Sequence, residues 1–511
     1  MTLPVIREVY NLERYSLARA NAGTYLNVAV GTRLTLQSKE GQLPKDFAQW
    51  LDLLTGPLTW LIQQHSALSV VIGDHLSANP MFLRLPSVDL AKIIRVTSIN
   101  KLDEFAQVLE YEHAHPFDLT DFEIPLWRIA VVHVKEDDSF YLIYVFMHAI
   151  GDGRSAMSLS EQLVEQLNIH AAKPTSLDGK PSLPTVVTSP NDPLPLPMEE
   201  RVNCDPRLFT LVKEAILSLL LPAFVKKAIE PKYWSGEVDA TLEAPHDTRV
   251  GMWCLSKEET AQLTQASKAH KTTIQSILFT ASCFAIKSVF LSKVEGSKAT
   301  TTKDKLSYAT PVALRPLISP PISPQDQGNY TSELVTKNIQ IDLDTGFWDL
   351  TKSYREQIIK GTKTPEGVRG MVEHAGLLKY LPNQPGGWED FLRGQVTKEQ
   401  HGRMATLKLS NVGKAWDQPS PESVAFKVEE GIFSQSSGLT SSAFTLNAAT
   451  ANGVLSMIGT WQKTTFTSCD RAHLYMAEFK RILLEATEPG RKDYRFQETL
   501  LPLHGVKSSV V

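Results

Sequence analysis

The stretch YLIYVFMHAIGDGRSAMSLSEQLVEQL, residues 141–167, joins three local patterns. It begins with the apolar and aromatic residues of a buried strand, passes through a polar turn, and continues with apolar residues at helical spacing. The residues on the helical face are Ala156, Leu159, Leu163 and Leu167. A second strand-like run, 126–134, is separated from the run 140–147 by a short acidic turn. The two runs predict a β-hairpin that leads into a helix.

The polar turn carries His148 and Asp152, and glycines stand on both sides of Asp152. Two interpretations of these residues are open. In the structural one, the histidine is a satisfied core side chain and Asp152 caps the following helix. In the chemical one, the glycines allow a sharp turn that projects the imidazole into a cleft. An imidazole with a pKa near 6.5 is largely neutral at cellular pH and can accept a proton from an alcohol.

Other chemistries fit the chain less well. The letters GDGRSA match a loose dinucleotide-binding pattern, but the acidic residue nearest the required spacing is Asp178, where no strand is readable. Four histidines between residues 113 and 148 raise the question of a metal, yet they lack cysteine or carboxylate ligands at a recognised spacing, so we expect no metal site. These histidines are His113, His115, His133 and His148. Phosphate loops, zinc-protease motifs and serine-nucleophile elbows are absent from the sequence.

A chain of 511 residues is too long for one ordinary core, so we expect two lobes. The 52 basic and 56 acidic residues create no field that would recruit a polyanion, which argues against a nucleic-acid partner. The proline-rich segment 171–198 predicts a linker or long surface loop. We therefore expect an N-terminal lobe over residues 1–200 and a C-terminal lobe over residues 201–511.

Both halves mix strands and helices, which indicates an α/β or α+β fold. In the second half, the run 272–291 predicts a long buried helix, and the runs near 305–316, 403–413 and 445–462 are strand-like. A closing helix is expected around residues 472–486.

The segment 208–229 is apolar, but charges and Pro222 interrupt it, so it predicts an amphipathic helix and not a membrane span. We expect it to cover a lobe or a channel mouth, with an interfacial membrane helix as the alternative. The four cysteines form no zinc, redox or disulfide pattern, and the first residues lack the apolar core of a secretory signal. The expected location is cytoplasmic, with attachment to the endoplasmic reticulum or lipid droplets as a variant.

His148, Asp152 and Gly153 form the His-x-x-x-Asp-Gly signature, and three further segments occur in the matching order. These are HPFDLTDFEIPLWRI at 115–129, TPVALRP followed by GNYTS at 310–332, and LSNVG at 409–413. Together they resemble the CoA-dependent acyltransferase superfamily, which includes chloramphenicol acetyltransferase, plant BAHD enzymes and peptide-synthetase condensation domains. The opening ERYSLARANAGTYLNVAV, residues 13–30, resembles fungal alcohol acetyltransferases. Met147 stands where condensation domains and wax synthases carry another histidine, and the Asp-Phe-Gly-Trp-Gly segment of plant enzymes is absent.

The resemblance implies two chloramphenicol-acetyltransferase-like lobes, each a mixed sheet flanked by helices, with a tunnel between them. Acyl-CoA and the alcohol would enter from opposite faces and meet at His148, the implied general base. Asp152 would point away from the substrates and pair with Arg315, so that Asp152, Gly153 and Arg315 support the site. Ser410 and Asn411 are candidates for the oxyanion site or the channel, with ordinary turn formation as an equal alternative. No CoA-contacting residue follows from spacing, because lysines such as Lys408 and Lys414 are commonly solvated charges.

The function that we expect is transfer of an acetyl or short acyl group from acyl-CoA to the hydroxyl of a small acceptor, such as an alcohol, a sterol or a fungal secondary metabolite. Acetyl-CoA would be a co-substrate, no cofactor would be permanently bound, and the protein would be a monomer. One alternative is a condensation-like enzyme that takes its acyl group from a carrier protein and forms an ester or amide. Another is a non-catalytic relative that binds a ligand or a partner.

Overall fold

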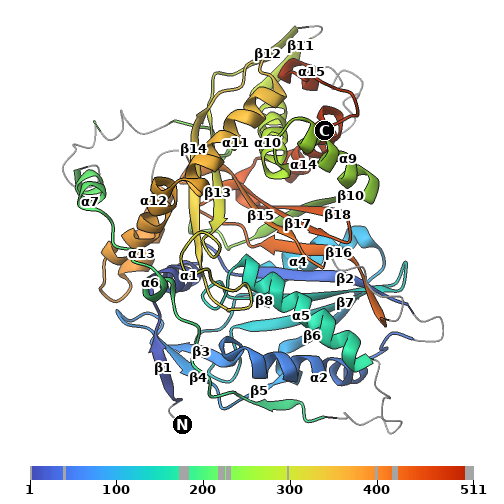
Figure 1. Cartoon of the computed structure of the whole chain (residues 1–511), viewed down its shortest axis with the longest axis vertical. Coiled ribbons are helices and arrows are strands. Elements are labelled where there is room, and N and C mark those ends of the chain that lie inside the picture. The colour runs from blue at the N-terminus through green and yellow to red at the C-terminus, as the bar shows by residue number, and fades with distance from the viewer. Residues whose placement is uncertain are drawn as a thin grey trace.

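Figure 1 shows a computed structural model of the chain, in which two large mixed sheets lie one above the other. The structure describes residues 3–37, 42–171, 183–216, 225, 232–295, 298–397, 401–416 and 424–500. Helices flank both sheets, so the chain has the mixed α/β class that the sequence predicts.

The first sheet has five strands in the order β16-β2-β8-β7-β6. All neighbours in it are antiparallel except β6 and β7, which are parallel. Two long helices, α2 (Phe47–Gln64) and α5 (Gly153–Ala171), cover one face, and α4 (Phe105–Ala114) packs on the other. The strands are β2 (Val28–Leu36), β6 (Ile94–Ile99), β7 (Trp127–Val134), β8 (Ser139–Phe146) and β16 (Phe426–Gln435).

The predicted hairpin and helix are both confirmed. Strands β7 and β8 pair antiparallel from Trp127 opposite Phe146 to Val134 opposite Ser139. Helix α5 follows, and the four apolar residues of its predicted face are all buried. Because β8 lies between two antiparallel neighbours, the unit is not the parallel βαβ of a dinucleotide-binding fold. Asp178 lies outside the described residues.

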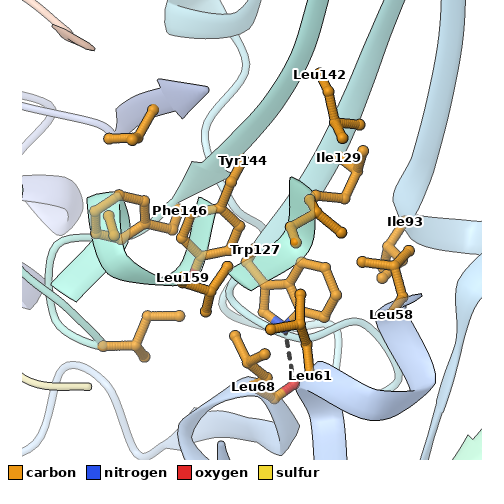
Figure 2. Packing of buried hydrophobic residues seen from close by; sticks show 14 of the residues in the cluster. Leu58, Leu61, Leu68, Ile93, Trp127, Ile129, Leu142, Tyr144, Phe146 and Leu159 are labelled. Atoms are coloured by element: carbon orange, nitrogen blue, oxygen red, sulfur yellow. Dashed lines mark hydrogen bonds between the residues drawn. The ribbon is translucent and has the colours of Figure 1, made fainter. Parts of the chain in front are cut away.

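Trp127 lies at the centre of the core between this sheet and its helices (Figure 2). Its indole is buried, and its Nε1–H donates to the Leu68 backbone oxygen at 2.8 Å, which satisfies the polar end of the ring. Leu58 and Leu61 from α2 and Leu159 from α5 pack beside it. The end of β8, and with it the polar turn, therefore emerges from a rigid core.

The second sheet has six strands in the order β10-β18-β17-β15-β13-β14. They are β10 (Thr248–Leu255), β13 (Leu306–Ala313), β14 (Thr331–Ile339), β15 (Ala405–Lys414), β17 (Ser442–Ala451) and β18 (Val454–Gln462). Its helices are α9 (Lys257–Ala269), α10 (Ile274–Leu291), α11 (Phe347–Lys363), α12 (Pro365–Gly376) and α14 (Cys469–Ala486). The expected strands and the closing helix all appear here, and the run 445–462 is a β17–β18 hairpin.

Helix α10 is the expected long buried helix. Among the described residues, α10 alone is long and apolar enough to cross a membrane. However, 78% of its length is buried inside the protein. Its neighbours α11 and α14 pack on it. These contacts are those of a core helix.

Shorter elements complete the described fold. The strands are β1 (Val5–Glu8), β3 (Val70–Gly73), β4 (Met81–Arg84), β5 (Ser87–Asp89), β9 (Val186–Thr188), β11 (Ser292–Glu295) and β12 (Lys298–Thr301). The helices are α1 (Asn11–Asn21), α3 (Leu90–Ile93), α6 (Met198–Arg201), α7 (Leu208–Ala215), α13 (Gly387–Gly394) and α15 (Phe496–Leu500). Helix α1 precedes β2 and lies close to the junction of the two sheets.

The first sheet is not built from the first half of the chain alone. Strand β16, from the second half, pairs with β2 along its whole length. It packs against both sheets, since it also contacts β17 and β18. The polar turn after β8 therefore lies where the two sheets meet (Figure 1). The lobe boundary near residue 200 stays a prediction.

The described part of the segment 208–229 differs from the expected covering helix. Leu208 is 76% exposed and Phe209 is 79% exposed, so this part of α7 does not cover a lobe. It is tethered from its polar side, where Arg207 and Thr210 bind the Glu373 carboxylate of α12. The proline-rich segment is described from residue 183 onward and is extended, with β9 as its one strand in the described part.

Candidate active site

The turn between β8 and α5 places His148 at the end of a buried strand. Its neighbours Met147, Ala149 and Ile150 are buried, while His148 itself is partly exposed. The Ile150 N–H donates to the Met147 backbone oxygen at 3.1 Å, which closes the turn. The residues around His148 are thus packed in the core, while His148 as a whole is partly exposed.

Asp152 caps helix α5, as the structural interpretation predicts. Its Oδ1 accepts the Ser155 N–H at 2.9 Å, and the Asp152 N–H donates back to the Ser155 hydroxyl at 3.0 Å. This reciprocal pair satisfies backbone donors that the first helical turn leaves open. Helix α5 therefore begins at a fixed point directly after the histidine.

The second oxygen of Asp152 binds Arg315, which comes from the loop after β13. Asp152 Oδ2 accepts from Arg315 Nε and from the Tyr330 N–H, both at 3.1 Å. The remaining donors of Arg315 reach the Ser323 and Gly328 backbone oxygens, and its guanidinium lies over the Tyr330 ring. Asp152 and Arg315 are both buried. The pair links the turn to the second half of the chain, and Asp152 is fully engaged away from the imidazole.

Gly153 allows α5 to approach the second half of the chain closely. A Cβ at this position would lie 2.9 Å from Val412 Cγ1 on β15 and 3.5 Å from the Phe433 ring on β16. A larger side chain would separate the helix from both strands. Arg154 adds to the junction by donating to the Val412 backbone oxygen.

The side chain of Asn329 contacts His148. Its Nδ2 lies 3.3 Å from His148 Nδ1 and 3.5 Å from the His148 backbone oxygen. The rings of Tyr25 and Phe146 lie 6.1 Å and 6.5 Å from the imidazole, centroid to centroid. The base candidate is therefore surrounded by two aromatic rings and one amide.

Burial and, after it, the positive charge of Arg19 lower the pKa of His148 to about 4. A hydrogen bond to the backbone of His148 and the charge of Asp152 act in the opposite direction. The ring is consequently neutral at pH 7, the state that a general base requires.

The two tautomers of the neutral ring use different contacts, because Asn329 Nδ2 is a donor and can hydrogen-bond Nδ1 only when Nδ1 carries no proton. When Asn329 donates to Nδ1, the ring proton is on Nε2. When Nδ1–H donates to the backbone oxygen of His148, Nε2 carries the free lone pair and can accept a proton. General-base chemistry at Nε2 requires the second arrangement.

Ser410 and Asn411 lie on β15, near the junction. Ser410 is partly buried and pairs in register with Asn447 of β17. Asn411 is exposed, and its Oδ1 accepts the Gly413 N–H at 2.9 Å, where Gly413 has a φ of +82°. The Asn411 side chain thus stabilises a local turn, which is the alternative to a role in the channel. Ser410 is the stronger of the two candidates for the oxyanion site.

The described residues contain no group of three histidine, cysteine, aspartate or glutamate side chains that is arranged to hold a metal ion. The four histidines between residues 113 and 148 have separate surroundings. His113 is buried between Asn27 and Ser434, His115 bonds the Tyr111 backbone oxygen, and His133 pairs with Asp138.

The family model for alcohol acetyltransferases matches residues 101–483, which include the His148 turn, Arg315 and most of both sheets.

The chain belongs to the alcohol acetyltransferase family.

Two curated relatives are proteins of filamentous fungi and fission yeast. The chain is 23% identical over 478 residues to the "Probable alcohol acetyltransferase FCK4" of Fusarium pseudograminearum, with 90% of this chain and 91% of that protein covered. It is 24% identical over 380 residues to the "Uncharacterized protein C18B11.03c" of Schizosaccharomyces pombe, covering 73% and 75% of the two chains. Membership in this family assigns acyltransferase chemistry to the protein.

Solved structures share the fold at low sequence identity. The trichothecene 15-O-acetyltransferase TRI3 of Fusarium sporotrichioides superposes with a TM-score of 0.62 at 12% identity and covers 94% of each chain. The condensation domain of the Monacolin K polyketide synthase MokA superposes with a TM-score of 0.58 at 10% identity, over 96% of this chain and 99% of that one. The chain therefore has the two-lobe fold of acetyltransferases and condensation domains, as predicted.

Several neighbours of His148 in this alcohol acetyltransferase family member were not predicted as site residues. In the sequence, Asn329 appears only within the GNYTS segment. Arg19 and Tyr25 appear only within the segment 13–30, which resembles fungal alcohol acetyltransferases. Lys408 is not an isolated solvated charge: it pairs with Glu333 at 3.2 Å, and its charge contributes to lowering the pKa of His148. The segments 13–30 and 328–329 could have indicated these neighbours, because both carry the resemblance to the family.

Proposed function

We propose that the protein is a CoA-dependent O-acyltransferase that moves an acetyl or short acyl group to the hydroxyl of a small acceptor, with His148 as general base. The observation that supports this most strongly is a neutral, partly exposed imidazole at the junction of the two sheets, with a carboxylate behind it that is engaged elsewhere. That combination suits proton abstraction and leaves Asp152 a supporting role.

In the proposed reaction the acceptor oxygen attacks the carbonyl carbon of the thioester directly. His148 takes the hydroxyl proton as the new C–O bond forms, and the carbonyl electrons move to oxygen. Collapse of this tetrahedral species breaks the C–S bond, and the imidazolium returns the proton to the leaving thiolate. No acyl-enzyme forms, and no bound cofactor is needed beyond the co-substrate acyl-CoA.

Donor and acceptor would reach His148 through a tunnel between the sheets, one from each face. The alcohol acetyltransferase family supports an acetyl donor such as acetyl-CoA and an alcohol as acceptor. We propose a sterol or a fungal metabolite as further acceptor classes. A carrier-bound donor is the alternative, because condensation domains share the fold. A non-catalytic binding protein is disfavoured by the intact His148 and its organised surroundings.

We also propose a monomer in the cytoplasm that contacts a lipid surface through α7. Leu208 and Phe209 are exposed neighbours on this helix, and Arg207, which precedes them, keeps an exposed guanidinium while it pairs with Glu373. Apolar side chains beside basic residues are the features by which helices lie in an anionic membrane interface. The endoplasmic reticulum or lipid droplets would be suitable surfaces.

The test of the catalytic proposal uses the purified full-length protein with acetyl-CoA and a panel of primary and secondary alcohols and amines. Release of the CoA thiol and the mass of the product are measured. His148→Ala is expected to lower kcat by about 10²- to 10⁴-fold, the usual contribution of a general base. His133→Ala, a partly exposed histidine on the adjacent strand β7, serves as the matched control and should retain parental activity.

Full activity of His148→Ala would remove the base assignment. Turnover with carrier-bound donors alone would favour the condensation reaction, and absence of turnover with every donor would favour a binding protein.

A further inference from the structure

Arg19, in the last turn of α1, lies beside the proposed base. Its Cζ lies 4.7 Å from the centroid of the Tyr15 ring and 4.3 Å from that of the Tyr25 ring. The Tyr25 ring in turn lies 6.1 Å from the imidazole of His148. The guanidinium thus packs on the rings of Tyr15 and Tyr25, and the Tyr25 ring neighbours both it and His148.

The hydrogen-bond donors of Arg19 are largely unused. Among the described residues its side chain makes one long hydrogen bond, from Nη2 to the Ser16 hydroxyl at 3.4 Å, and its Nε is buried without a partner. It forms no ion pair with a carboxylate in the part of the chain that the structure describes. A guanidinium has five N–H donors, so this one can bind a further oxygen.

Ser16 connects Arg19 to the imidazole. The Ser16 hydroxyl also accepts from Asn329 Nδ2 at 3.3 Å, and the same Nδ2 lies 3.3 Å from His148 Nδ1. One hydroxyl thus touches both the unpaired guanidinium and the amide that contacts the base. Arg19 is therefore part of the polar shell of the site.

The other charges around His148 are balanced. The turn contributes Asp152, which pairs with Arg315, and β15 contributes Lys408, which pairs with Glu333 of β14. Arg19 is the remaining charge that acts on the imidazole, and of these charges it has the largest effect on its pKa. The site consequently carries one uncompensated positive charge, which favours any state with an added negative charge.

We propose that Arg19 is a second catalytic residue, which donates a hydrogen bond to the anionic oxygen that forms on the thioester carbonyl. This inference rests on the proposed acyl transfer. During attack, the carbonyl electron pair moves to oxygen, the hydroxyl proton moves to His148, and Arg19 stabilises the oxygen anion without giving up a proton. When the C–S bond breaks, the electron pair on oxygen re-forms the carbonyl, and the negative charge leaves on the thiolate sulfur, which takes the proton from His148.

The experiment compares Arg19→Gln and Arg19→Lys with the parent, using acetyl-CoA and both neutral alcohols and hydroxy acids. Arg19→Gln is expected to lower kcat about 10²- to 10³-fold for every acceptor, the usual loss for one oxyanion donor, while Arg19→Lys, which keeps the charge, should recover part of it. Arg14→Gln is the matched control, because Arg14 is a cation on the same helix that stacks on Trp388 away from the site. It should keep parental rates.

The pH profile gives a readout that a purely structural role would not change. Loss of the positive charge raises the pKa of His148, so the acid limb of kcat/KM should move to higher pH in Arg19→Gln and remain near its parental position in Arg19→Lys. Thermal unfolding of both variants shows whether they are folded.

Unchanged kcat and an unchanged acid limb in folded Arg19→Gln would overturn the assignment, while loss of activity in His148→Ala would leave the proposed function intact. A defect limited to KM for hydroxy acids would also overturn it, because Arg19 would then bind an acceptor carboxylate. A parent that transfers no acyl group would overturn both proposals.

Discussion

The carboxylate of Asp152 accepts hydrogen bonds on both oxygens and forms an ion pair with Arg315, and both side chains are buried. Removal of one partner from a buried pair leaves the other charge uncompensated. We expect Asp152→Asn to reduce the free energy of unfolding by about 3–5 kcal/mol. Urea denaturation measures this loss.

Asp205→Asn is the control, since Asp205 pairs with Lys379 at the surface and both side chains are well exposed. It should change stability by less than about 1 kcal/mol. Equal effects of the two substitutions would contradict a structural role for the buried pair.

Gly153 is required for a close approach, not for an unusual backbone angle. Gly153→Ala would place a methyl group 2.9 Å from Val412 Cγ1, and we expect a loss of about 1–3 kcal/mol from overpacking. Gly370→Ala, in the exposed part of helix α12 with open space around it, should be neutral or stabilising by about 0.5–1 kcal/mol. Thermal unfolding of both variants is the measurement, and a stable Gly153→Ala protein would refute the packing argument.

Helix α7 is the element whose proposed role depends on its exposed side chains. The double variant Leu208→Asp, Phe209→Asp should leave stability unchanged, because both side chains are more than three-quarters exposed. It should bind vesicles of phosphatidylcholine and phosphatidylserine at least about tenfold more weakly than the parent, because two apolar contacts are lost. Co-sedimentation measures the bound fraction.

Leu474→Asp tests whether any exposed leucine has this effect, because Leu474 is 45% exposed on α14. Its vesicle binding should equal that of the parent. Equal binding by the α7 variant and the parent would exclude this helix as the lipid contact.

Strand β16 connects the two halves into one molecule. It forms the edge of the first sheet beside β2, and its buried residues Phe426, Val428 and Phe433 belong to the core of that sheet. We therefore expect a fragment of residues 1–200 to expose the β2 edge and to aggregate or remain unfolded. Circular dichroism and light scattering would show this, and a monomeric, folded fragment would contradict it.

Buried neutral histidines make the stability of the whole protein sensitive to acid. Burial lowers the pKa of His113 to about 3, and the positive charges of His246 and Arg128 contribute. Between pH 6.5 and 3, His113 is protonated in the unfolded chain but stays neutral in the folded protein. The free energy of unfolding therefore decreases as pH falls through this range and levels off below it. Above pH 6.5 the contribution is complete.

Urea denaturation at pH 7.5, 6 and 5 should therefore show decreasing unfolding free energy, with a slope of up to about 1.4 kcal/mol per pH unit for each such histidine. His113→Gln should reduce the slope, and His133→Gln is the control, because His133 on β7 is partly exposed. An identical slope in His113→Gln would contradict the assignment.

Local patterns of the chain determined much of this protein. The apolar runs before Met147 and the helical spacing after Gly153 are short-range features, so the β7–β8 hairpin and α5 were predictable. The motif around His148 and Asp152 indicated the chemistry, and its resemblance to a family anticipated the Asp152–Arg315 pair, which the structure contains.

Other features arise from contacts between distant segments. The pairing of β16 with β2 joins residues some 400 positions apart, and no spacing in the sequence encodes such a register. Arg19 and Asn329 become neighbours of His148 only when α1 and the loop before β14 pack against the turn. The pKa of His148 depends on that burial and on those charges, because desolvation and Coulomb interaction act through space and not along the chain. The sequence by itself therefore determined the proposed base and its strand–turn–helix support, while the tertiary structure decided which side chains surround it.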